Sequence, residues 1–143
     1  MKKIIYFLLL CFIFSNYCFA QTVNNFFTLE INNIVNNGGT IYIGIFSTAE
    51  SFRREEPDFL FELKAINTTM VQELSLPNGE YVITVIQDAN NDQRLDFGLF
   101  GIPRELVGIS NYNGKCFPSR NFNRQKILID RTTERITINL YRF

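Results

Sequence analysis

The sequence predicts an all-β domain, an antiparallel β-sandwich of about seven strands with one long structured loop. Several short segments alternate apolar and polar residues with a period of two, which is typical of strands that bury one face. Residues that favour turns, namely Asn, Gly and Pro, separate these segments. Stretches with helical periodicity are short, so a sheet packed on a sheet is the expected architecture, and a small barrel is the alternative.

Residues 1–20 are typical of a secretory signal peptide. Two lysines form a positive start, residues 4–14 carry no charge, and Ala20 ends a more polar stretch. We therefore expect cleavage after Ala20, which leaves residues 21–143 as a single domain that is either secreted or periplasmic. An uncleaved membrane anchor is the alternative, although the apolar run is shorter than the about 20 residues that a spanning helix needs. No later segment is apolar for long enough to span a bilayer.

The first two strands are expected at residues 26–34 and 40–47. In the first, phenylalanine, leucine and isoleucine alternate with threonine, glutamate and asparagine. Between the two strands, residues 36–39 read Asn-Asn-Gly-Gly, and both residue types tolerate the positive φ that tight hairpin turns need. The sequence therefore predicts that the second strand returns beside the first as a β-hairpin.

The next segments combine charge with renewed alternation. Residues 48–57 are strongly charged, and we expect a loop with a short helical turn at residues 51–56. Residues 58–66 are read as a short strand, although a helix also fits their pattern. Residues 68–76 alternate again, and the Pro-Asn-Gly sequence of residues 77–79 predicts a turn.

The second half of the chain contains the most apolar strand and the longest loop. Residues 81–86 are apolar on both faces, which indicates a central position in a sheet. Residues 89–118 form a long, glycine-containing stretch, and a loop of this length in a compact domain is usually functional or held by its own packing. Two further strands are expected at residues 126–130 and 134–141, so that the whole pattern fits an immunoglobulin-like or prealbumin-like sandwich.

The composition excludes several function classes. With 14 basic and 14 acidic residues, the chain offers no electrostatic case for binding nucleic acid or an anionic membrane surface. It has no histidine, which removes Ser-His and Cys-His catalytic pairs in their usual form and the commonest zinc ligand.

Of its three cysteines, Cys116 alone would remain after cleavage, so an internal disulfide is excluded. Cys116 is a small half-buried side chain, an intermolecular bridge or a nucleophile, and free cysteine most often takes the first role.

The segment after the central strand carries the main candidate site. Its oxygen side chains have the spacing of positions 1, 3, 5 and 9 in a calcium-binding loop: Asp88, Asn90, Asp92 and Asp96. Gln93 replaces the glycine that lets such a loop turn sharply, and Leu99 replaces the bidentate glutamate, a role that Glu105 would have to take. A metal-free turn held by Asp and Asn side chains is the competing interpretation. A third interpretation makes the aspartates catalytic carboxylates, as in glycoside hydrolysis.

Five segments in this order resemble a known family pattern: residues 76–82 (LPNGEYV), 87–92 (QDANND), 95–96 (LD), 100–105 (FGIPRE) and 108–111 (GISN). The pattern is that of domain-of-unknown-function family 2141, an uncharacterised bacterial secreted family. The resemblance implies export and a β domain, and it brings no activity with it. The positions that match the family motifs are Asp88, Asn90, Asp92, Asp96, Gly101, Pro103, Glu105 and Asn111. Gln87 stands where the family often has histidine, which weakens any role for a histidine ligand or base there, and Asn78 replaces the second proline of the turn.

Two functions compete at this stage. The first is an exported, non-catalytic binding module whose acidic loop at residues 88–96 is stabilised by calcium, with an envelope protein or a glycan as the kind of ligand considered. The second is a small secreted enzyme that uses aspartate and glutamate side chains of the same loop. A purely structural component of the cell envelope is a third option that the sequence does not separate from the first.

Overall fold

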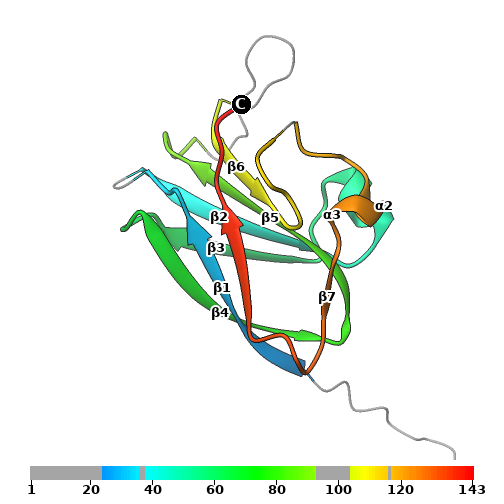
Figure 1. The fold of residues 1–143 in the computed structure, drawn as a ribbon. Coiled ribbons are helices and arrows are strands. Elements are labelled where there is room, and N and C mark those ends of the chain that lie inside the picture. The colour runs from blue at the N-terminus through cyan, green and yellow to red at the C-terminus, as the bar shows by residue number, and fades with distance from the viewer. Residues whose placement is uncertain (1–23, 36–37, 93–103, 116) are drawn as a thin grey trace, which may run out of the picture.

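The computed structural model describes residues 24–35, 38–92, 104–115 and 117–143 (Figure 1). The expected signal peptide, Asp96 and Cys116 lie outside these described residues. The described part of the chain contains eight strands and two short helices: β1 (Asn24–Asn32), β2 (Thr40–Phe46), α2 (Ala49–Arg54), β3 (Phe59–Lys64), β4 (Thr69–Pro77), β5 (Gly79–Asp88), β6 (Leu106–Ile109), α3 (Phe122–Gln125), β7 (Ile127–Ile129) and β8 (Arg135–Asn139).

These strands form two sheets. One has three strands in the order β4-β1-β8, and the other has the order β3-β2-β5-β6, with β7 also paired to β5. All of these pairs are antiparallel except the parallel pair of β1 and β8. The prediction of an all-β sandwich with mostly antiparallel strands is confirmed, and so is the central position of the apolar strand β5.

The core lies between the two sheets because the period-two alternation points one face of each strand inward. From β1, Leu29 and Ile31 are fully buried, and from β2, Ile41, Ile43 and Ile45 are as well. All five belong to one continuous cluster of buried side chains that draws on both sheets. Each side chain of this size contributes about 1.5–3 kcal/mol when it leaves water, so this cluster is the main source of stability.

The predicted hairpin of the first two strands is wrong. β1 pairs with β4 and β8, whereas β2 pairs with β3 and β5, so the connection between β1 and β2 crosses from one sheet to the other. The two strands were located correctly, but they do not pair edge to edge. They lie in different sheets, which face one another across the core. Turn residues such as Asn and Gly allow the chain to reverse direction, and they serve a crossing between sheets as well as a hairpin.

The short charged helix is found close to where it was expected. The Thr48 hydroxyl caps the start of α2 by accepting a hydrogen bond from the Ser51 backbone amide at 3.0 Å. Glu55 ends the helix in the left-handed conformation, with a φ of 60°. Asp58 then ties this helix to β2, because its carboxylate accepts from the Ser47 amide at 2.6 Å and from the Ser51 hydroxyl at 3.0 Å.

Two elements within the second half were not expected, namely β6 and α3. β6 is only four residues long, and it falls inside the stretch that the sequence presents as one irregular loop. Its Gly108 lies so close to β8 that an added Cβ would come within 2.6 Å of the Ile138 side chain. Strand pairing with β5 therefore defines this segment, and its own short sequence gives little period-two signal.

Within the part of the chain that the structure describes, no helix has both the length and the apolar character needed to cross a bilayer.

Candidate functional site

Strand register brings two acidic side chains together where β5 ends and β6 begins. Asp88 is the last residue of β5, and Glu105 directly precedes β6. The antiparallel register pairs Gln87 with Leu106, so the next position along the two strands sets Asp88 opposite Glu105. Side chains at opposed positions point to the same face, with Cβ atoms about 4.5–5.5 Å apart. The pairing of β5 with β6 thus positions both carboxylates.

A tight turn then returns a third carboxylate to the same place. The Asn90 side-chain oxygen accepts a hydrogen bond from the Asp92 backbone amide at 3.1 Å, and the Asn90 amide donates to the Asp92 carboxylate at 2.8 Å. Between them, Asn91 has a left-handed φ of 58° and accepts from the Thr40 hydroxyl of β2 at 3.0 Å. This is the Asp/Asn-held turn considered from the sequence, and it folds Asp92 back toward Asp88.

The backbone beneath this turn is tightly packed. Gly39, with a φ of 72°, lies directly against the end of β5, and an added Cβ there would come within 1.8 Å of the Asp88 carbonyl oxygen. Such an approach is open to glycine alone, both because of the contact and because of the left-handed backbone. The connection into β2 therefore fixes the backbone from which the Asp88 side chain projects.

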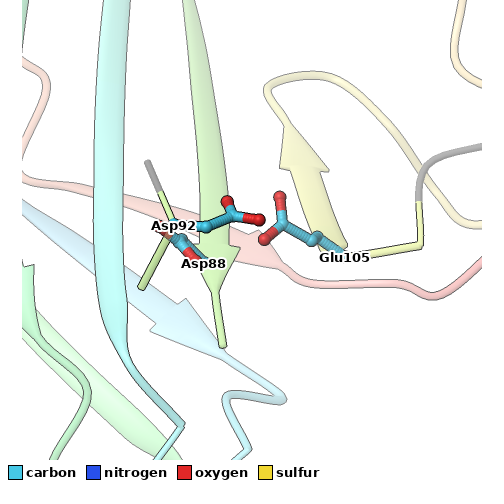
Figure 2. Close-up of side chains that lie close together, drawn as sticks. All are labelled: Asp88, Asp92 and Glu105. Carbon is cyan, nitrogen blue, oxygen red and sulfur yellow. The ribbon is translucent and has the colours of Figure 1, made fainter. Parts of the chain in front are cut away.

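Asp88, Asp92 and Glu105 form what we call the acidic cluster. One carboxylate oxygen from each residue lies within 4.8 Å of those from the other two. Asp88 is 2% exposed and Glu105 is 7% exposed, whereas Asp92 is on the surface. Figure 2 shows the carboxylates of Asp92 and Glu105 directed toward one another, with Asp88 beside Asp92. The cluster thus has two buried members and one that reaches solvent.

The electrostatics of the acidic cluster favour a cation. Carboxylates at this separation repel one another when they are all ionised, and burial weakens the screening by water. Their field reaches a neighbouring side chain on β2. Burial raises the pKa of the Tyr42 hydroxyl, and the negative charges of Glu62, Asp88 and Glu105 raise this pKa further. A cation between the carboxylates would remove most of that repulsion.

The separations suit calcium. Two oxygen ligands of one calcium ion lie at most twice the calcium–oxygen distance apart, about 4.6–5.2 Å. The three oxygens of the acidic cluster lie within 4.8 Å of one another, so one calcium ion could contact all of them. Each carboxylate supplies one or two oxygens, so these three side chains could provide three to six of the six to eight oxygen ligands that calcium takes.

The structure places the four sequence candidates differently. Asp88 and Asp92 lie together, the Asn90 side chain holds the turn through Asp92, and Asp96 lies outside the described residues. The third carboxylate comes from Glu105, which lies outside the loop spacing and which the sequence offered only as a substitute for the missing glutamate. Showing that it meets Asp88 would have required recognising β6, because the β5–β6 register sets it opposite Asp88.

Gln87, the neighbour of Asp88, faces the other way and has a structural role. Its side-chain oxygen accepts from the Val35 amide at 2.9 Å, and its side-chain nitrogen donates to the carbonyl oxygens of Val35 at 2.8 Å and of Gly38 at 2.7 Å. Successive strand residues point to opposite faces, which explains why Gln87 is directed away from the acidic cluster. It fastens the connection between β1 and β2 to β5.

Comparisons with other proteins give one match. No curated protein matches the chain, and no solved structure does. A family model described as an uncharacterized protein conserved in bacteria matches residues 29–137, which is well over half of the chain. The chain therefore belongs to domain-of-unknown-function family 2141, the family whose motifs its central segments resemble.

Proposed function

We propose that this protein is an exported, non-catalytic β-sandwich domain in which the acidic cluster binds calcium. The observation that carries the proposal is the meeting of three carboxylates within 4.8 Å, two of them on buried residues. Export is supported by the sequence of residues 1–20, with its lysines, its uncharged run and its small residue at position 20. Extracellular calcium modules bind their ion with a Kd of about 10⁻⁴–10⁻³ M, which matches the calcium available outside cells.

Calcium would link the ends of two neighbouring strands. Asp88 is the last residue of β5, Glu105 directly precedes β6, and Asp92 lies in the turn after β5, so one ion would join three points of the chain. A ligand that binds only the folded state stabilises it by mass action, by about 1.4 kcal/mol when its concentration is about ten times the Kd.

The geometry favours metal binding over acid–base catalysis. The hollow that Glu105 lines has a volume of about 210 Å³, and among the described residues neither Asp88 nor Asp92 lines it. Small-molecule sites usually span about 300–1,000 Å³. The two carboxyl groups of an inverting glycosidase stand about 6.5–9.5 Å apart to admit a water molecule, an arrangement that carboxylate oxygens within 4.8 Å of one another do not provide, whereas the about 5–5.5 Å of a retaining enzyme is closer to the acidic cluster.

A thermal melt tests the proposal. We expect about 10 mM calcium to raise the Tm by about 4–8 °C over the same protein in chelator, given a millimolar Kd and a domain of this size. Asp88→Asn and Glu105→Gln should each abolish most of this rise. Glu73→Gln, on the exposed side of β4, is the matched control and should keep it. An equal Tm with calcium and with chelator would refute calcium binding.

A further inference from the structure

The outer face of the five-stranded sheet holds a second, separate site. Outward-facing residues alternate along each strand with the core residues, so this face lies opposite the one that packs against the three-stranded sheet. A pocket of about 550 Å³ lies on it, with a floor formed by Gly44 of β2, Thr84 and Ile86 of β5, and Val107 of β6. This volume is in the range of sites for small molecules.

Aromatic side chains brace the walls of this outer pocket. Phe52 of α2 packs edge-on against Phe46 at a centroid distance of 5.3 Å and against Phe122 of α3 at 6.4 Å. On the other side, Phe143 packs against Phe117 at 5.1 Å. The two helices lie side by side next to the sheet (Figure 1), and they seal one end of the face over a small buried cluster. The walls are therefore preorganised apolar surfaces.

The two ends of the outer pocket carry different charged groups. At the helical end, Arg53, Glu55 and Arg120 line it. Both arginines are ion-paired, Arg120 with Glu55 at 3.9 Å and Arg53 with Glu50 at 2.8 Å, but a guanidinium has five N–H donors and keeps some of them for a ligand. At the other end lies Tyr42, where burial raises the pKa of the hydroxyl and the carboxylates of Glu62, Asp88 and Glu105 raise it further. The pocket thus offers arginine donors at the helical end and has carboxylates near the Tyr42 end.

We propose that the outer pocket binds a single-chain amphipathic carboxylate, with its apolar tail along the floor toward Tyr42 and its headgroup at Arg53 and Arg120. The floor and the aromatic walls offer the apolar surface that a tail requires. The arginines offer the planar donors that carboxylates prefer. The carboxylates near Tyr42 repel a headgroup placed at that end, so we expect the headgroup at the arginines.

Binding of three matched probes tests this proposal. Decanoate, decanol and decylamine share one tail and differ in headgroup charge, and calorimetry in a chelating buffer below the concentration at which they aggregate removes any part that calcium plays. We expect decanoate to bind tighter than decanol by on the order of tenfold, since a hydrogen bond to a charged group contributes about one decade of affinity. Decylamine should bind most weakly.

Variants locate the headgroup and the tail. Arg120→Gln should reduce the affinity for decanoate several-fold and leave that for decanol unchanged, whereas Arg131→Gln, in the exposed turn after β7, is the control and should change neither. Ile86→Trp should fill the floor and abolish binding, while Val71→Trp, at an outward position of the other sheet, should not.

Decanol or decylamine binding as tightly as decanoate would overturn the headgroup assignment. Unchanged decanoate binding in a folded Ile86→Trp protein, or none in the natural protein, would overturn the site.

Discussion

At the scale of single residues, Gln87 shows how a buried polar side chain can define a connection. Its three hydrogen bonds supply side-chain partners to the Val35 amide and to the carbonyl oxygens of Val35 and Gly38, and the bond to Gly38 is buried. The family motif often has histidine at this point, and a neutral imidazole offers one donor and one acceptor where Gln87 uses two donor bonds and one acceptor bond. The residue therefore belongs to the framework that presents Asp88.

Replacing Gln87 should be costly. Gln87→Ala removes the side-chain partners of the part-buried Val35 amide and of the buried Gly38 carbonyl oxygen, at about 1–3 kcal/mol for each group left unsatisfied, and it also removes a buried side chain from the structure. We expect a loss of about 3 kcal/mol or more in the free energy of unfolding, measured by urea denaturation. Gln72→Ala is the matched control, because the Gln72 side chain bonds only to an exposed carbonyl oxygen on β4, and it should cost less than about 0.5 kcal/mol. Similar losses in the two variants would contradict the role of Gln87.

The three members of the acidic cluster show where reasoning from sequence stops. The spacing of Asp88, Asn90 and Asp92 is a local property, and both the calcium interpretation and the Asp/Asn-held turn follow from it. The structure contains that turn and, in the same place, a carboxylate from Glu105. The sequence offered Glu105 as a substitute ligand but could not show that it lies beside Asp88, because its position depends on pairing between two strands, one of which has almost no signal of its own.

At the scale of the elements, Asp58 joins three pieces of structure. Its carboxylate accepts hydrogen bonds from the amide and hydroxyl of Ser47 after β2 and from Ser51 in α2, and β3 begins at the next residue. These hydrogen bonds, first of all the one from the Ser47 amide, hold the pKa of Asp58 below its ordinary value of 3.8. The depressed pKa makes the contribution of Asp58 to stability depend on pH.

The sign of this dependence is determined by the direction of the shift. A carboxyl with a lower pKa in the folded state stabilises the fold above its unfolded pKa, near 3.8, and that contribution is lost as the pH falls toward the folded pKa. Between neutral pH and pH 3, the natural protein should therefore lose more stability than Asp58→Asn does. Urea unfolding at several pH values measures the difference, with Glu73→Gln as the control that keeps the natural slope. Parallel curves for the natural protein and Asp58→Asn would refute this coupling.

Strand positions could be predicted far better than strand partners. The alternation located β1, β2 and β4 to within a few residues, because burial of one face leaves a direct mark on the sequence, and a run apolar on both faces located β5. Sheet membership leaves no such mark. The turns after β1, after β4 and after β7 all join strands of different sheets, although their residues are those of ordinary hairpins. Local turn chemistry specifies that the chain reverses, and the tertiary packing specifies which sheet it enters.

At the scale of the whole molecule, one core holds both sheets. Ile138 of β8 is 1% exposed and pairs in register with Ile31 of β1. Ile138→Ala should reduce the free energy of unfolding by about 2–5 kcal/mol because it leaves a cavity where the sheets meet. Urea titrations followed by far-UV circular dichroism and by tyrosine fluorescence should shift together. Ile136→Ala, at a half-buried position of the same strand, is the control and should cost less. Two separate transitions would show that the sheets unfold independently.

The whole outer face of the five-stranded sheet also has a consistent order. The helices cover one end, the apolar pocket occupies the middle, and the acidic cluster lies one same-face step, about 7 Å, beyond the floor residues Ile86 and Val107. The proposed calcium site and the proposed carboxylate site are therefore neighbours: the pocket and its arginines are separate from the acidic cluster, whose charge enters only the orientation of the headgroup. The calcium melt and the decanoate titration in chelator test them separately.

The parallel pairing of β1 with β8 has a consequence for how the chain acquires its fold. Thr28 lies beside Arg135, so the central strand of the three-stranded sheet lacks one neighbour until almost the whole chain is present. Contacts between segments so distant in sequence form slowly, since the entropy cost of closing a long loop comes before any stabilisation from the contact. A ribosome or a translocation channel delivers the N-terminal end first, so the edge of β1 that pairs with β8 stays without its partner strand until β8 emerges. The three-stranded sheet can therefore be completed only after β8 is available.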